Sequence, residues 1–375
     1  MQAGERRDVS RHWLRSTLRR AAFAIALLAV LCAVPIVGVE TGCTAVPHAE
    51  VPALTREFNI TDAGYRRAEG DSYLTYPEWY IVHAYADLAA VTRQSSESDF
   101  DYLASIRGFW TSLCRSTIAA AGAGPVTTGQ KVTNYIIGIS FTGEMAIKGL
   151  YERTIGAFTA WIRGPERTPE DGFALHLLDD YAAFLQQTPW YRYPFASELV
   201  RFWRETSMSD GNPVRKVERR FGLSLEYGGK AAYAALIGFA AGYDPADLRI
   251  KSVIEGLDDT DIAADPRITK VRELGDGATL IETPRYQEFT EILRGLGARG
   301  RAVLEIAGNR RILSTVLAPS LVRIETPGAV EIFSLPIQSR PGWQRLGLNT
   351  EVRALAQLIG SVERQGAIFE HAYDY

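Results

Sequence analysis

Residues 21–39 read AAFAIALLAVLCAVPIVGV, a run without a charged side chain. A run of this length and composition can cross a bilayer as a helix. Six arginines precede it: Arg6, Arg7, Arg11, Arg15, Arg19 and Arg20. Basic residues beside a first spanning helix stay in the cytoplasm. The sequence therefore predicts a cytoplasmic basic segment over residues 1–20, a transmembrane anchor over 21–39, and most of the mass outside the inner membrane.

The same stretch has two other interpretations. An arginine-rich flank, an apolar run and the small residues 43–45 occur in the order of a cleaved signal peptide, but the run is long for one. The pair Gly42-Cys43 hints at a lipoprotein, but Glu40 stands where the lipid-attachment signal needs an aliphatic residue. A retained helix is the interpretation that the length of the run favours.

The length, charge and cysteine content of the chain exclude several classes of function. A chain of 375 residues can hold two domains beyond the anchor. Its 41 basic and 44 acidic residues nearly cancel, so we do not expect a nucleic-acid partner. Three cysteines without a Cys/His cluster predict neither zinc nor another metal, and no cofactor motif is present. Cys43 and Cys114 could pair in an oxidising compartment, although an unreactive buried thiol at Cys114 is the simpler interpretation.

Residues 40–72 carry prolines and charges without a sustained period, which indicates a linker that leaves the membrane. Order resumes at Thr75, which stands three residues before Glu78 as in a capping box. Pro77 is tolerated in a first helical turn. We therefore expect a helix over residues 77–90.

That helix carries a candidate polar pair. Trp79, His83 and Asp87 recur every four residues, so they share one stripe, and Asp87 could orient the His83 imidazole. The pair is only half of a catalytic constellation, because no nucleophile is placed nearby by the sequence. A satisfied histidine on an aromatic helix face is the simpler interpretation.

Further helices are expected over residues 103–118, 171–187 and 196–206, where apolar residues recur with the helical period. A proline-bounded aromatic turn over residues 188–194 joins the last two. The segment 73–243 is therefore predicted to be a mainly helical domain.

Two segments of this domain, 82 residues apart, share one pattern. The first contains Glu144, Lys148, Tyr151, Ile155 and Gly156, and the second contains Glu226, Lys230, Tyr233, Ile237 and Gly238. These offsets place the Glu, Lys, Tyr and Ile side chains on one side of a helix, and Glu four residues before Lys favours an ion pair. Our hypothesis is that the two helices pack through these stripes and form a polar binding site. Chance similarity of two helices is the alternative.

Neither 132–150 nor 226–243 is long enough to cross a bilayer without including its charges. We expect both to be buried core helices or interfacial segments. A topology with three crossings is the alternative, because the basic cluster just before the second segment would then be cytoplasmic.

After an acidic linker over residues 244–267, the sequence pattern changes to short β-type runs and tight turns. Strands are predicted over 278–282, 301–307, 310–317 and 367–373, and helices over 285–296 and 351–364. The order strand, helix, strand, strand, helix, strand is that of a ferredoxin-like α/β sandwich, here over 268–375 with extra hairpins at 320–347. On a regular final strand, His371 would face away from Glu370 and pack as a structural histidine. The fold class is thus α+β.

The segments Tyr-Pro-Glu-Trp-Tyr at 76–80 and Glu-His-Ala-Tyr-Asp-Tyr at 370–375 resemble those of a set of uncharacterised bacterial membrane-anchored proteins. The resemblance covers most of the chain after residue 70 and implies a bacterial membrane location but no activity. No nucleophile, metal or phosphate motif emerges. We therefore expect a non-enzymatic accessory or binding module of the cell envelope, with the lipid bilayer and other envelope proteins as partners. The alternative is a membrane-associated enzyme that uses the Glu/Lys/Tyr or the His/Asp site.

Overall fold

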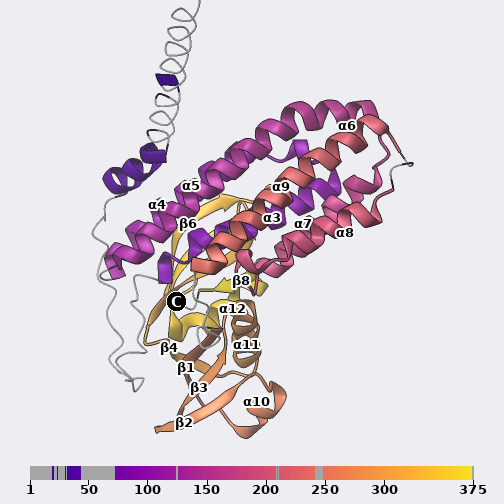
Figure 1. Cartoon of the computed structure of the whole chain (residues 1–375). Helices are drawn as coiled ribbons and strands as arrows, with labels where there is room; N and C mark the ends of the chain where they lie inside the picture. The colour runs from indigo at the N-terminus through magenta and orange to yellow at the C-terminus, as the bar shows by residue number, and fades with distance from the viewer. Residues whose placement is uncertain are drawn as a thin grey trace, which may run out of the picture. The chain divides into compact units, whose positions relative to one another are not determined.

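The structure, a computed structural model, describes residues 19–20, 23, 30, 32–43, 72–123, 126–207, 209, 211–240 and 248–373 (Figure 1). The chain divides into two compact units, Met1–Thr44 and Ala45–Tyr375. In the first unit, residues 32–42 are helical, and most of the predicted anchor lies outside the described residues. Within the part that is described, no helix combines the length and apolar character that a membrane crossing requires.

The second unit begins with a helical part, as the sequence predicts. Its helices are α3 (Tyr76–Gln94), α4 (Tyr102–Ala123), α5 (Thr128–Tyr151), α6 (Ala157–Arg163), α7 (Pro169–Leu185), α8 (Phe195–Glu205) and α9 (Pro213–Ala240). A π-helical turn, η2 (Glu152–Gly156), joins α5 to α6, and two short 3-10 turns, η1 (Glu97–Asp99) and η3 (Trp190–Arg192), lie between helices. The prediction of a mainly helical middle is confirmed.

Two local signals in this part have different outcomes. The capping box expected at the start of α3 is not formed, because the Thr75 hydroxyl donates to the carbonyl of Ser72 at 2.9 Å instead of accepting an amide. In α7, by contrast, Thr168 and Asp171 form a reciprocal capping box. Cys32 is the free cysteine among the described residues, so the interpretation of Cys114 as a free thiol is wrong.

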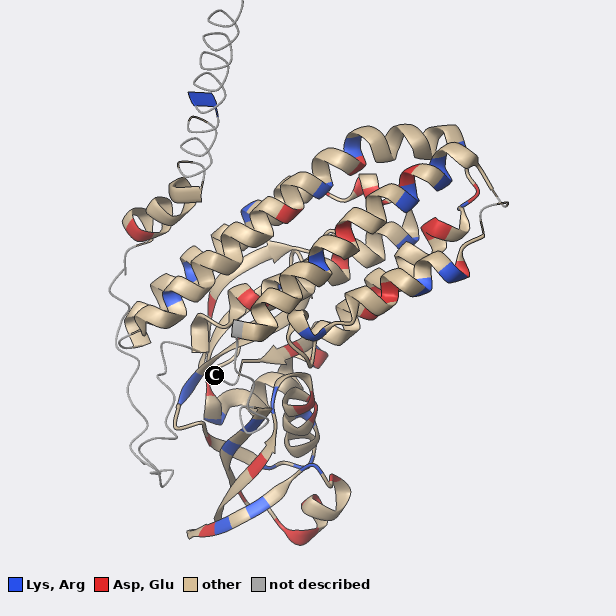
Figure 2. Cartoon of the chain, viewed as in Figure 1, with Lys and Arg blue, Asp and Glu red and all other residues tan. Residues whose placement is uncertain are grey.

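Over residues 248–373 the chain forms two four-stranded antiparallel sheets (Figure 1). The first contains β1 (Arg249–Glu255), β2 (Thr269–Gly275), β3 (Ala278–Pro284) and β4 (Ala302–Ile306), with helices α10 (Asp259–Ala264) and α11 (Tyr286–Ala298). The second contains β5 (Arg311–Pro319), β6 (Ala329–Pro336), β7 (Trp343–Glu351) and β8 (Ile368–Ala372), with helix α12 (Leu355–Arg364). Charged side chains of both signs are interspersed along both parts of the unit (Figure 2).

These sheets correct two expectations. The six elements assigned to one ferredoxin-like sandwich all exist, but they are divided between two sheets, so the single sandwich is wrong. The acidic segment 244–267 is not simply a linker, since β1 lies at the interior of the first sheet and α10 follows it. Strand β1 was not predicted because its composition is mixed and its burial comes from neighbours distant in sequence.

The second sheet repeats the first. The strand orders are β2-β3-β1-β4 and β6-β7-β5-β8, which are the same order counted from the first strand of each sheet. In both sheets the pairing of the first and last strands shifts by one residue at the same place. The extra residue of this β-bulge is Leu304 in β4 and Glu370 in β8. The C-terminal part is therefore an internal structural repeat.

One face of each sheet joins a shared apolar core with α11 and α12. The opposite faces differ. On the first sheet, Val253, Ala278, Leu280 and Leu304 form a small apolar cluster. The strand pairing places Thr315, Arg345, Gly347 and Glu370 at the corresponding positions of the second sheet. That more polar face is the one that packs on α3 of the helical part.

Candidate functional site

The two stripes predicted from the sequence meet in the structure. Helices α5 and α9 run antiparallel, with Lys148 Nζ 2.9 Å from Glu226 Oε2 and Lys230 Nζ 2.8 Å from Glu144 Oε1. Lys230 also bonds Glu226 along its own helix at 3.0 Å. The prediction that the two stripes face each other is confirmed, and the ion pairs run mainly across the helices.

Behind this contact, Lys148 is 8 % exposed and lies between two carboxylates, because Glu97 Oε1 is 2.7 Å from its amine. Burial works against the charge, but Glu226 and Glu97 raise the pKa of Lys148 well above its ordinary value. Burial would likewise raise the pKa of Glu226, but Lys148 and Lys230 hold it well below its ordinary value. Lys148 and Glu226 therefore both stay charged at neutral pH.

The basic residues at the start of α9 continue this network. Arg219 is 2 % exposed and bonds Glu97 at 2.9 Å and Glu152 at 2.7 Å. Arg215 is paired with Asp171 at 2.8 Å. The cluster that a three-crossing topology would place in a cytoplasmic flank is thus buried and neutralised within the helical part, which removes the charge argument for that topology.

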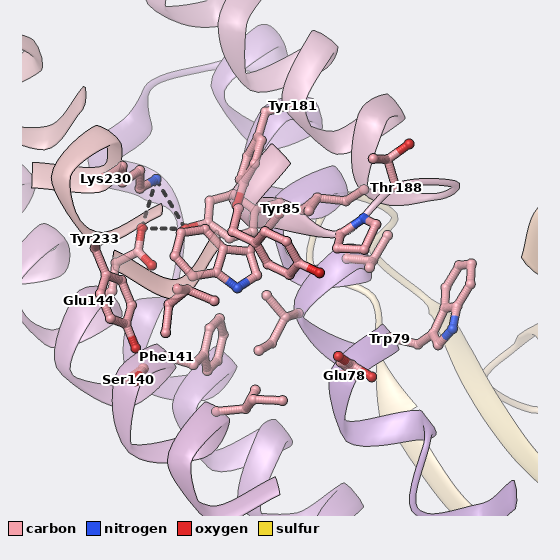
Figure 3. Close-up of a pocket in the computed structure, with 18 of the residues that line it drawn as sticks. Glu78, Trp79, Tyr85, Ser140, Phe141, Glu144, Tyr181, Thr188, Lys230 and Tyr233 are labelled. Carbon is pink, nitrogen blue, oxygen red and sulfur yellow. Dashed lines mark hydrogen bonds and ion pairs between the residues drawn. The ribbon is translucent and has the colours of Figure 1, made fainter. Parts of the chain in front are cut away.

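A pocket of about 410 Å³ opens between α3, α5, α7 and α9 (Figure 3). Its wall is mostly aromatic and aliphatic, and its polar end is formed by Tyr85, Glu144 and Lys230. The aromatic turn after α7 contributes Trp190, whose ring lies 5.1 Å from that of Tyr233. A largely apolar cavity of this size with a few convergent polar groups is typical of a small-molecule site.

The polar end is a closed hydrogen-bonded triangle (Figure 3). The Tyr85 hydroxyl donates to Glu144, and Lys230 Nζ lies 3.3 Å from the Tyr85 oxygen. Burial and the Glu144 charge raise the pKa of Tyr85 well above its ordinary value, so the phenol is neutral. The Glu144 side chain is 35 % exposed, which leaves its carboxylate accessible to a hydrogen-bond donor in the pocket.

His83 and Asp87 lie elsewhere, where α3 packs on the second sheet. His83 Nε2 is 3.3 Å from the Tyr373 hydroxyl, and His83 Nδ1 is 3.7 Å from Glu370. Glu370 is held by Arg345 through bonds of 2.6 and 2.8 Å. Burial, with Arg345 nearby, lowers the pKa of His83 to about 3, so the imidazole is neutral.

Asp87 does not orient His83, so that expectation is wrong. Its carboxylate instead accepts from the Ser339 hydroxyl and from the Gln338 amide, the latter at 3.3 Å. Both residues belong to the turn between β6 and β7. A spacing of four residues puts two side chains on one stripe, but it cannot tell which neighbouring segment each will reach.

The two motifs at 76–80 and 370–375 contact each other. The Trp79 and His371 rings are 3.9 Å apart, and the Tyr76 and Tyr373 rings are 5.6 Å apart. The expected separation of Glu370 from His371 is wrong, because the bulge at Glu370 interrupts the alternation and lets both side chains reach α3.

The structure therefore distributes the predicted site residues over three places. Glu144, Lys230 and Tyr233 line the pocket, Lys148, Glu226 and Tyr151 lie in the network behind it, and His83 and Asp87 lie in the contact with the second sheet. The sequence missed Tyr85, which lies off the 79–83–87 stripe of its helix, and Glu97, which lies in the short turn η1 between two helices. Comparison of the chain with protein-family models, with curated proteins and with solved structures gives no match.

Proposed function

We propose that the chain is a membrane-anchored envelope protein whose helical part binds an apolar or amphipathic small molecule in the pocket between α5 and α9. The pocket itself is the observation that supports this most: about 410 Å³ of space with mostly aromatic and aliphatic walls, a polar end at Glu144 and Lys230, and a further carboxylate at Glu78. The charge-free run at 21–39 and its arginine flank support attachment to a bacterial inner membrane with the folded part outside.

The polar end suggests the chemistry of the ligand. Lys230 is already surrounded by Glu144, Glu226 and Tyr85, so an additional anion would have to displace an existing partner. Glu144 is the accessible acceptor at this end, and Glu78 is a second carboxylate in the lining of the pocket. The best-matched ligand has an apolar body and a hydroxyl or amine that faces Glu144.

Binding is favoured over acid–base catalysis by the charge states at this end. An efficient general acid or base has a pKa near the working pH. Instead, Glu144 and its neighbours hold the pKa of Lys230 well above its ordinary value despite burial, and burial raises that of Tyr85. Neither group exchanges a proton readily at neutral pH.

The test uses the full chain, purified from its membrane and extracted with organic solvent for mass spectrometry. Ser140 points into the pocket from α5, so Ser140→Trp fills the cavity without replacing a core side chain (Figure 3). Ala146→Trp, on an exposed position of the same helix outside the pocket, is the matched control. The parent and the control should carry a bound compound in near-stoichiometric amount, and Ser140→Trp should lose most of it.

Equal amounts of every extracted compound in all three preparations would refute the pocket as a binding site. A circular-dichroism spectrum of each preparation shows that the comparison is between folded chains.

A further inference from the structure

The outer side of α5, η2, α6 and α9, here called the apolar face, exposes large side chains to solvent. Its exposed members include Ile147 (73 %), Leu150 (70 %), Phe158 (59 %), Trp161 (78 %), Phe221 (63 %) and Leu225 (62 %). Among the residues of these elements, Arg153 of η2 is an exposed charged residue, with a side chain that is 51 % exposed. Exposed apolar side chains that gather into a patch mark a contact with a membrane or a partner, whereas scattered ones are ordinary.

The distribution of charged and apolar side chains on α9 is the reverse of that on an ordinary surface helix. Every one of its charged residues is buried or half-buried, from Arg219 at 2 % to Glu226 with a side chain 21 % exposed. Its exposed positions between Val214 and Phe239 carry only apolar, aromatic and glycine residues. Helices in water turn charge outward, whereas helices in contact with lipid turn polar groups towards the protein interior.

The exposed sides of the two helices face the same way. On α5, Ile147 lies about a quarter turn from Lys148, and Leu150 lies about 160° from Lys148 in the same sense, given about 100° per residue. On α9, Leu225 lies about a quarter turn from Glu226. Because the ion pairs 148–226 and 144–230 make the helices antiparallel, both quarter turns lead to one side.

We propose that this apolar face docks on the lipid bilayer. The inference rests on the proposed membrane attachment and adds a second contact to it. Residues 44–71 can extend at most roughly 100 Å, at about 3.5 Å per residue, so an anchor at 21–39 would confine the start of the folded part to within about that distance of the membrane. The exposed positions of α9 carry no charged side chain, whereas the rim of a specific protein interface is polar. Trp161 and Phe158 are side chains suited to the membrane interface.

Docking of this face would also determine how the ligand reaches the pocket. Ile136 and Tyr233 line the pocket and are 56 % and 40 % exposed, so the pocket reaches the surface between α5 and α9. A face that lies on the bilayer would receive its ligand from the lipid phase, which fits the apolar lining.

The test places a fluorophore on a bioorthogonal amino acid at Leu150 or Phe221 in the full chain, reconstituted in phosphatidylcholine–phosphatidylglycerol vesicles. The matched control carries the same label at Leu321, which is 97 % exposed after β5. We expect blue-shifted emission, quenching by acyl-chain nitroxide lipids and protection from iodide at 150 and 221. The label at 321 should show the reverse.

Iodide quenching at 150 and 221 as strong as at 321 would overturn the docking. Protection that persists in lipid-free detergent solution and rises with protein concentration would also overturn it, since a second copy would then cover the face. The anchor and the apolar face are tested separately by this experiment. A chain that fails to sediment with the vesicles refutes both anchor and face, whereas a chain that sediments with water-exposed labels refutes the face alone.

Discussion

Replacing Lys148 by methionine tests how far the buried ion network stabilises the helical part. The amine lies 2.7 Å from Glu97 and 2.9 Å from Glu226 and is 8 % exposed. Lys148→Met keeps the length of the side chain but leaves two carboxylates short of a partner. Removing one member of a buried pair costs roughly 3–5 kcal/mol. Each carboxylate keeps a second cation, Arg219 or Lys230, so we expect the lower end, about 3 kcal/mol.

The double variant Lys148→Met/Glu226→Gln separates charge imbalance from lost packing. It removes one charge of each sign, so it should be less destabilised than Lys148→Met alone by at least roughly 1 kcal/mol. The control is Lys270→Met, which removes an amine paired with Glu273 on the surface and should leave stability unchanged within error.

The assay is urea-induced unfolding of the full chain in one fixed mild detergent, followed by fluorescence. A lower midpoint at constant slope reports the loss of stability. If Lys148→Met unfolds at the parent's midpoint, or if the double variant is less stable than the single one, the network does not hold the two helices together as argued.

Three further predictions follow from other contacts. The pKa of His83 is lowered to about 3 in the folded chain, whereas the unfolded chain has the ordinary histidine value of about 6.5. As the pH falls below about 6.5, the unfolded chain therefore binds a proton at His83 that the folded chain does not, and the free energy of unfolding should decrease. His83→Gln should flatten this slope by up to about 1.4 kcal/mol per pH unit in unfolding titrations between pH 6.5 and 4.5, and parallel curves would contradict the assignment. Gly347→Ala should lower the free energy of unfolding by roughly 1–3 kcal/mol in the same assay, because the new Cβ would lie 2.2 Å from the Phe333 ring. Gly342→Ala is the comparison, since Gly342 has a positive φ but open space around it. Periplasm-active reporters fused after residues 60 and 375 should both be active, and an inactive fusion at 60 would refute the orientation of the anchor.

The amino-acid sequence alone predicts the parts of this molecule whose signals are local. The helices of the middle follow from apolar residues at the helical period, and nearly all predicted C-terminal strands and helices exist. The matched stripes at 144–151 and 226–233 even predict a long-range contact, because two polar faces in apolar surroundings stabilise each other only when they meet. The charge-free run at 21–39 sets the expectation of an anchor by its length and composition.

Tertiary structure decides what those local signals leave open. Strand composition does not specify a partner, so only the folded chain divides the C-terminal elements between two sheets. The bulge at Glu370 arises from pairing with β5, and it brings Glu370 to His83 against the expected alternation. Glu97 and Tyr85 join the site because helices distant in sequence pack around them, and the pocket exists only where four helices leave space between their side chains. Such features depend on the relative placement of distant segments, which a periodic pattern within one segment does not encode.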